Sequence, residues 1–286
     1  KGSTFTLRFL AEKVVERTRT TPIITSDKRA EDINIVVIDD DQSILLLITE
    51  LLKQKKMGAI TFTNGKEALS ALEKLPFDLV ITDIQLPEMN GFHFVTLFNE
   101  KYAVAPLPVL AITGRRDVPE SFYTKSGFSG ILPKPFTPEK FYEKLKVFFP
   151  NLNTEVEHKP IMVMPYNNTN GYTPEVLESF MGDDIEGIVG IYKHFLSETE
   201  ENLQKLEASA KMQDYATIKS IAHKMTSMFA QINAQRESEI LIVLNKVDKE
   251  VPEDLEEKIK NLTHFFKEDC RPIIENYLSS FSGGSL

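Results

Sequence analysis

The sequence contains one cysteine, Cys270, among 286 residues. A single cysteine excludes an internal disulfide and is typical of a reducing cytoplasm. The five histidines are scattered, so the ligand spacing of a zinc site is also missing. No apolar run approaches the roughly 18 to 20 residues that span a bilayer. We therefore expect a cytoplasmic polypeptide without direct membrane contact, and a membrane anchor elsewhere in a longer protein stays open.

Positive charge is scarce as well. The net charge is −9, and from Gly171 onward 21 acidic residues face 12 basic ones, so this last part carries the whole excess. A basic stripe that could grip a phosphate backbone is absent, which argues against nucleic-acid binding. The sequence starts at Lys1 without a visible secretory signal, as a piece of a longer protein does.

What the first half does have is an alternation of short apolar runs and amphipathic stretches, which predicts a doubly wound parallel sheet of five strands. The strands are expected at 34–39, 58–63, 78–83, 107–113 and 129–132. The helices are expected at 42–56, 65–75, 90–101, 118–126 and 138–149.

The second half has helical periodicity throughout. It predicts a short helix and then an antiparallel four-helix bundle, so the fold class is α/β plus all-α. The helices are expected at 174–181, 184–209, 213–232, 236–248 and 254–280. Residues 150–170 hold three prolines and five asparagines and are expected to be a linker, and residues 282–286 a disordered tail.

Polar residues stand where four of the apolar runs end. They are Asp39-Asp40-Asp41, Asp83, Thr113 and Lys134. Ligands bind beyond the carboxyl ends of parallel strands, so we expect these side chains to meet in a site. Carboxylates at that spacing repel one another and require a positive partner, either a hard divalent ion such as Mg²⁺ or Lys134. In the alternative interpretation each acid is a solvated strand end or a helix cap, as Asp41 could be.

This set, in this order, resembles response regulator receiver domains over residues 33–149, which are flavodoxin-like. The resemblance implies that Asp83 accepts a phosphoryl group and that Thr113 and Lys134 bind its oxygens. Phosphoryl transfer needs positioning and charge neutralisation, which these residue types supply. The cofactor implied is Mg²⁺, and its ligands would be Asp39 (through water), Asp40, Asp83 and the backbone carbonyl of Gln85.

Two positions depart from the receiver pattern. Gly114 stands where alanine is usual, and Ile131 replaces the usual switch Tyr or Phe. We therefore expect the chemistry to survive without a rotating aromatic switch. On the helix after Asp41, Leu46 lies opposite the apolar stripe, where it could belong to a docking patch or be an isolated exposed leucine.

A second reactive residue is expected on the 213–232 helix. The apolar stripe leaves His223 about 140° from its centre, exposed among small neighbours such as Ser227. A neutral imidazole in such a place can accept a phosphoryl group. The segment 222–227 resembles the phosphoaccepting helix of histidine phosphotransfer domains, with Ser227 where that family has glycine. The family's lysine is replaced by Thr226, and Lys219 is the candidate that offsets phosphoryl charge.

Residues 1–9 resemble the end of a histidine-kinase ATPase domain. The whole is then similar to the C-terminal part of a hybrid sensor kinase: 1–32 end of the ATPase domain and linker, 33–149 receiver, 171–281 histidine phosphotransfer domain. The resemblance implies a phosphorelay in which Asp83 takes a phosphoryl group from a kinase histidine and His223 passes it to a separate response regulator. An interaction module modified only at Asp83 and a reverse-flux phosphatase remain alternatives. Without the ATP-binding core, an enzymatic activity of this piece stays open.

Overall fold

The computed structural model describes residues 28–104, 106–115, 118–152, 171–248 and 250–282. The sequence segment that resembles the end of an ATPase domain, nearly all of the expected linker and residues 283–286 of the expected tail lie outside these ranges. Among the helices within these ranges, none combines the length and the hydropathy that a membrane span needs.

Five parallel strands form one sheet in the order β2-β1-β3-β4-β5, with a short 3₁₀ turn η1 (Ala30–Asp32) before it. The strands are β1 (Asn34–Ile38), β2 (Gly58–Phe62), β3 (Leu79–Asp83), β4 (Val109–Thr113) and β5 (Gly130–Pro133). The two central strands β3 and β4 are buried along their whole length. Helices cover both faces of such a sheet, which is why these strands read as continuous apolar runs. The expected doubly wound architecture is confirmed.

Each strand is followed by a helix. They are α1 (Gln42–Gln54), α2 (Gly65–Ala71), α3 (Gly91–Lys101), α4 (Glu120–Lys125) and α5 (Pro138–Phe148). Two buried clusters fill the spaces on the two faces of the sheet: α1 and α5 contribute to one, and α2, α3 and α4 to the other. Side chains of Asp41, Asn64, Asn90 and Thr137 cap four of the helices by accepting backbone N–H bonds.

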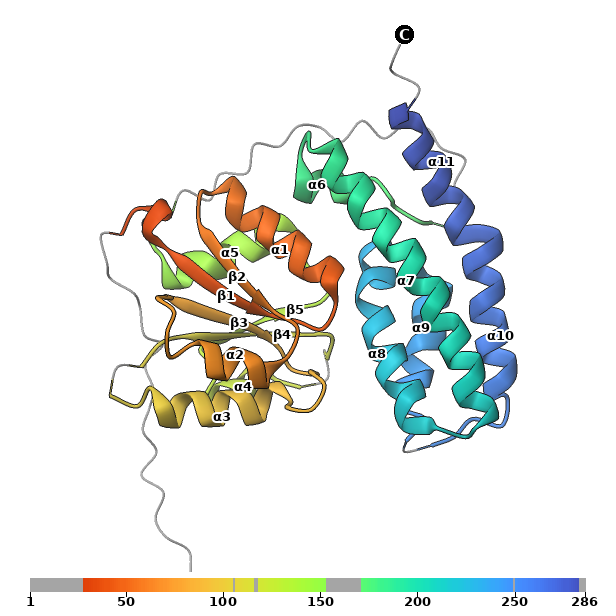
Figure 1. The fold of residues 1–286 in the computed structure, drawn as a ribbon, viewed down its shortest axis with the longest axis horizontal. Helices are drawn as coiled ribbons and strands as arrows, with labels where there is room; N and C mark the ends of the chain where they lie inside the picture. The colour runs from red at the N-terminus through yellow and green to blue at the C-terminus, as the bar shows by residue number, and fades with distance from the viewer. Residues whose placement is uncertain (1–27, 105, 116–117, 153–170, 249, 283–286) are drawn as a thin grey trace, which may run out of the picture.

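The region from Gly171 onward is helical. Its helices are α6 (Val176–Met181), α7 (Ile185–Lys211), α8 (Tyr215–Gln231), α9 (Gln235–Leu244), α10 (Leu255–Phe265) and α11 (Arg271–Ser282). A π-helical turn, η2 (Phe266–Cys270), joins α10 to α11 without a break. Aromatic rings form the centre of this region: the ring centroid of Phe195 is 5.1 Å from that of Phe229, and Phe266 packs against both. The long helices α7, α8 and α10 lie side by side (Figure 1).

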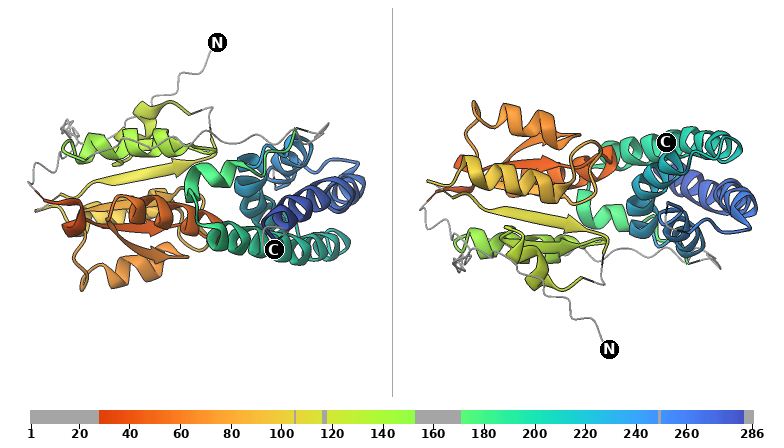
Figure 2. Two further views of the ribbon diagram at one scale, coloured as in Figure 1. Left: turned by 90° about the horizontal axis from the view of Figure 1, so that it is seen from above. Right: turned by 90° about the horizontal axis from the view of Figure 1, so that it is seen from below.

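The helical region packs on the end of the α/β domain. The carboxyl ends of the strands point toward it (Figure 2), and α1 contacts α6, α7 and α8. The ring centroids of Phe136 and Phe180 are 6.0 Å apart across this boundary, and the Gln54 amide donates to the carbonyl of Phe180. One buried apolar cluster runs from the sheet into the helices. The strand ends are therefore enclosed and not open to solvent.

Candidate functional site

The strand order places four of the candidate residues side by side. Asp39 directly follows β1, and Asp83 is the last residue of β3, which pairs with β1. Thr113 ends β4, the next strand, and Lys134 follows β5, where its N–H donates to the Thr113 carbonyl at 2.7 Å. The parallel sheet therefore brings the polar residues of four strand ends to one edge.

Lys134 occupies the centre of this group. Its Nζ is 2.8 Å from Oδ2 of Asp39 and also donates to Oδ2 of Asp83. Asp39, Asp83 and Lys134 are 1%, 2% and 7% exposed, so water screens these charges poorly. Such a buried triad requires further hydrogen bonds to offset the loss of hydration. The backbone supplies them: Asp41 N–H donates to Asp39 at 2.9 Å, and Gln85 N–H donates to Asp83 at 2.7 Å.

Burial and neighbouring charges shift the pKa values of the aspartates at the site. Burial and the neighbouring Asp83 raise the pKa of Asp40 to about 6. Burial also raises the pKa of Asp39, although Lys134 opposes the rise. For Asp83 burial acts in the same direction, but the charge of Lys134 and the hydrogen bonds from Lys134 and Gln85 oppose it, and the pKa is lowered. Asp83 is thus the aspartate of the group that stays ionised, in a site that still holds surplus negative charge.

Local packing holds the loop after β3 close to the backbone of Asp83. Asn90 caps α3 by accepting from His93 N–H at 2.9 Å, and Gly91 N–H donates to the Ile84 carbonyl at 2.8 Å. A Cβ on Gly91 would lie 2.6 Å from the Asp83 carbonyl oxygen. Only glycine allows this close approach, which draws the start of α3 against the backbone of Asp83.

Thr113 has a partner that sequence reasoning missed. Its hydroxyl lies 3.2 Å from the Tyr123 hydroxyl and accepts from Arg115 N–H at 3.1 Å. Tyr123, on α4, is 1% exposed and stacks on Phe92 with ring centroids 5.8 Å apart. Phe122 and Tyr123 are adjacent in sequence, and their sequence alone does not tell which one points inward.

On the helical region, α8 faces the strand ends. Its predicted apolar stripe is buried as expected: Ile218, Ile221, Ala222, Met225, Phe229 and Ile232. His223 was expected to be exposed, and this expectation is wrong: the side chain is partly buried, because the α/β domain covers this face. Ser227, one helical turn after His223, bonds the same Lys134 ammonium that bonds Asp83, so His223 lies on the part of α8 that faces the strand ends. Burial lowers the pKa of His223, with Asp83 opposing, so the imidazole is neutral at pH 7.

Of the docking candidates, Ser227 is at the contact. It is 8% exposed, and its Oγ accepts from Lys134 Nζ at 3.3 Å. Lys219 lies farther out and forms an ion pair with Asp248 at 2.7 Å. Lys224 pairs with Glu198. Leu46 on α1 is 40% exposed.

Comparison with known proteins identifies the α/β part. The response regulator receiver domain family matches residues 35–146. The sensor histidine kinase GacS of Pseudomonas protegens is 32% identical over 125 residues, which are 42% of this chain and 13% of GacS. A 14.6 kDa protein of Leptolyngbya boryana is 33% identical over 106 residues, which are 37% of this chain and 81% of that protein. The structure of the chemotaxis response regulator CheY4 of Vibrio cholerae is 28% identical, with a TM-score of 0.37, and covers 40% of this chain and 96% of CheY4.

Residues 35–146 are a response regulator receiver domain. The chain therefore takes part in two-component signal transduction, in which receivers interact with kinase histidine donors. It spans only 13% of the length of GacS and 21% of that of the regulator NtrC of Salmonella typhimurium.

Receiver domains generally bind Mg²⁺ for phosphorylation. Within the described residues, no three acidic, histidine or cysteine side chains are arranged to hold a metal together. Lys134 instead bridges Asp39 and Asp83. Mg²⁺ needs only one or two protein carboxylates and keeps several waters. The carboxylates of Asp40 and Asp83 are ligands of the kind that this ion takes, so these residues fit it.

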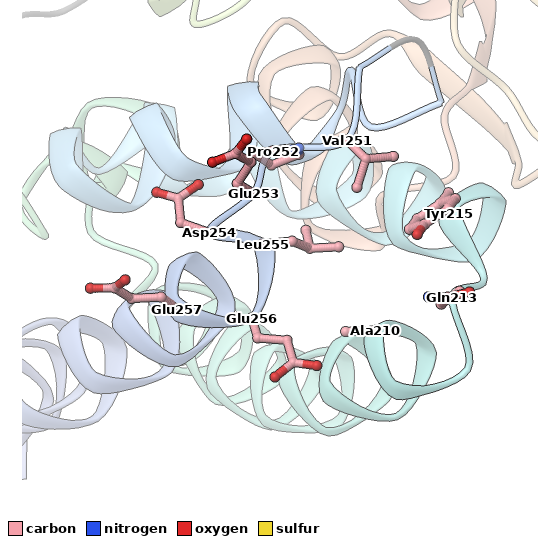
Figure 3. A pocket seen from close by; sticks show the side chains of 10 residues that line it. All are labelled: Ala210, Gln213, Tyr215, Val251, Pro252, Glu253, Asp254, Leu255, Glu256 and Glu257. Atoms are coloured by element: carbon pink, nitrogen blue, oxygen red, sulfur yellow. The ribbon is translucent and has the colours of Figure 1, made fainter.

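A separate hollow lies at the other end of the helical region (Figure 3). Ala210, Gln213, Tyr215 and residues 251–257 line it. The carboxylates of Glu253, Asp254 and Glu257 project on one side, opposite Gln213 and Tyr215. It shares no residue with the receiver site, and its lining contains no basic side chain that would attract a phosphoryl group.

Proposed function

We propose that this chain is a phosphorelay module in which Asp83 of the receiver and His223 of a histidine phosphotransfer domain exchange a phosphoryl group. The observation that carries the proposal is the position of Lys134. Its ammonium bonds Asp83 on one side and Ser227 on the other, and Ser227 lies one helical turn after His223. The receiver nucleophile and the imidazole are thus held at one contact.

The helical region supports the second half of this proposal. Its long helices α7, α8, α9 and the α10–α11 rod would form the four-helix bundle of a phosphotransfer domain over residues 171–281, with 150–170 as the linker from the receiver at 33–149. The apolar side of α8 is buried in this bundle, and the opposite side presents His223 to the receiver. A neutral imidazole has the free lone pair that a phosphoryl acceptor needs.

The steps balance as two displacements at phosphorus. An Asp83 oxygen attacks the phosphoryl group of a kinase phosphohistidine; the new P–O bond forms as the P–N bond breaks. A ring nitrogen of His223 then attacks the same phosphorus, a P–N bond forms, and the Asp83 carboxylate leaves. The other ring nitrogen keeps its proton, so no proton is released. Both steps are reversible, and net flow in the opposite direction would make the module a phosphatase arm of a relay.

The remaining site residues supply charge and position. Lys134 and the Thr113 hydroxyl would bind phosphoryl oxygens. Bound Mg²⁺ supplies further charge neutralisation, and its ligands would be Asp40, Asp83 and the Gln85 carbonyl, with Asp39 through water. Lys219 would offset charge on phosphorylated His223, and Leu46 would belong to the docking surface of a partner.

By this proposal the donor is a kinase histidine outside the chain, and the acceptor after His223 is the receiver of a separate response regulator, as in the C-terminal part of a hybrid sensor kinase. The continuous apolar core between receiver and helices also favours a second candidate. In that case phosphorylation of Asp83 alone changes how the two parts pack, and His223 stays unmodified.

Labelled acetyl phosphate with Mg²⁺ separates the two candidates. In the relay, label appears first on Asp83, as an alkali-labile acyl phosphate, and then on His223, as an alkali-stable and acid-labile phosphoramidate. D83N should lose both labels, and H223Q should keep the label on Asp83. Label confined to Asp83 in the unaltered chain would reject the relay in favour of the packing switch.

A further inference from the structure

Three polar or reactive side chains are aligned along the receiver-facing side of α8. His223, Ser227 and Gln231 are spaced four residues apart, so successive members lie one above another on the helix. Ser227 and Gln231 are both nearly fully buried, at 8% and 7% exposure. Buried polar groups normally have hydrogen-bond partners, and the partners of these two lie on the receiver.

Both partners belong to one turn of the receiver. Lys134 Nζ donates to Ser227 Oγ at 3.3 Å, and Gln231 Nε2 donates to the Phe136 carbonyl oxygen at 2.9 Å. Lys134 and Phe136 flank Pro135 at the end of β5. Ser227 and Gln231 are four residues, about 6 Å, apart along the helix, and both bond to residues of this one turn of the receiver.

These two hydrogen bonds fix the position of α8 along its axis. A slide by one helical turn, about 5.4 Å, would move both side chains out of reach of their partners. The same slide would carry His223 away from Asp83. Gln231 itself lies two turns from His223, so it acts on the reaction only through this alignment.

Gln231 bonds to the backbone of the receiver and not to a side chain. Its acceptor is the main-chain carbonyl of Phe136, which every residue type would provide at this position. The ring of Phe136 packs elsewhere, against Phe141 and Phe180. Gln231 therefore recognises the shape of the turn that carries the active-site lysine.

We infer that Gln231 is a positioning residue that sets the register of α8 on the 134–136 turn of the chain's own receiver and so aligns His223 with Asp83. This inference rests on the proposed transfer between the two residues. The hydrogen bond from the Gln231 amide to the Phe136 carbonyl is buried and neutral. Its removal leaves the buried carbonyl without a partner, so we expect the transfer from Asp83 to His223 to slow about tenfold.

The test uses the full chain with Q231M, which keeps the length of the side chain and removes the donor. The control is Q235M, since Gln235 is an exposed residue at the start of α9 that bonds Glu239 on its own helix. After loading with labelled acetyl phosphate and Mg²⁺, Q231M should phosphorylate Asp83 at least as fast as the unaltered chain, because the looser contact covers Asp83 less, and should pass label to His223 about tenfold more slowly. Q235M should match the unaltered chain in both steps.

A second measurement reports docking without any phosphoryl transfer. Diethyl pyrocarbonate modifies neutral, accessible imidazoles, and mass spectrometry resolves each site. Q231M should make His223 react several-fold faster, because the receiver covers it less, while the exposed His93 and His264 serve as internal standards. If the role of Gln231 is purely structural, Q231M should have a lower helix content by circular dichroism. The test is then repeated with Q231N, which keeps the amide on a side chain that is one methylene shorter.

The outcomes separate the two proposals. If His223 of the unaltered chain is never labelled, the relay fails, and the carbethoxylation rates still judge the role of Gln231. If His223 is labelled at equal rates in Q231M and the unaltered chain, and reacts equally with the reagent, the positioning role is refuted while the relay stands.

Discussion

Replacement of Tyr123 by phenylalanine removes one hydroxyl and leaves the aromatic packing on Phe92 intact, so it isolates the hydrogen bond to Thr113. The two residues are 1% and 2% exposed, which favours a sizeable contribution. The oxygens are 3.2 Å apart, longer than the usual 2.7 to 2.8 Å, which lowers it. A net value of about 1 kcal/mol follows for this neutral bond.

A double-mutant cycle with Y123F and T113V measures that value. Unfolding by urea is followed by far-UV circular dichroism, because the chain contains no tryptophan. We expect a coupling free energy of about 0.5 to 1 kcal/mol, provided that all four proteins unfold in a single transition. In the chain loaded with acetyl phosphate and Mg²⁺ the coupling should fall, since the Thr113 hydroxyl would then bind the phosphoryl group. A coupling below about 0.3 kcal/mol in the unloaded protein, the usual error of additivity, would refute the bond as a stabilising link.

Two further predictions concern stability. G91A should destabilise the chain by about 1 to 3 kcal/mol, because its Cβ would meet the Asp83 carbonyl oxygen at 2.6 Å. The control G114A, whose Cβ meets no atom of the described residues within 4 Å, should be neutral or slightly stabilising in the same urea titration. E237Q should stabilise the chain by about 1 kcal/mol at pH 7. Glu237 is fully buried, and its Oε2 has no hydrogen-bond partner among the described residues. Burial raises the pKa of Glu237, although the hydrogen bond from the Tyr172 hydroxyl opposes this rise. The folded state then binds the proton of the Glu237 carboxyl group more tightly than the unfolded state does, so the stability of the unaltered chain should fall as pH rises from about 4.5 through the raised pKa. E237Q should remove that part of the pH dependence. Equal pH profiles of the two proteins would contradict this prediction.

The strands and the residues at their ends were predictable because local signals agree with the fold. Each buried strand is a short run of apolar residues, and a polar residue marks where it leaves the core, as Asp83 does after Leu79 to Ile81. Asp41 also caps α1, so the alternative interpretation holds for this one acid. Periodicity, however, reports burial and not backbone conformation. The helix expected at 236–248 ends at Leu244, and Val247 keeps the apolar pattern from a turn that still packs in the core.

The contact between receiver and helices was not predictable from periodicity. A polar residue opposite the apolar stripe of a helix reads as solvated, whether it faces water or another domain. Ser227 was singled out only through a family resemblance, and Gln231 carried no distinguishing signal except its alignment with His223. The resemblance of segment 222–227 to a phosphoaccepting helix identified the face, and only the tertiary structure shows what covers it.

Lys134 links the two halves of the molecule through charge. In the structure it balances Asp39 and Asp83, and burial, which lowers its pKa, is outweighed by these two carboxylates, so it remains an ammonium. A phosphoryl group on Asp83 would add negative charge next to Lys134. The ammonium would then be attracted more strongly by the phosphoryl oxygens than by Asp39. Because it also bonds Ser227, a shift of the ammonium would change its contact with α8. The residue that stabilises charge on the receiver is thus also the residue that α8 contacts, so phosphorylation and docking act on the same ammonium.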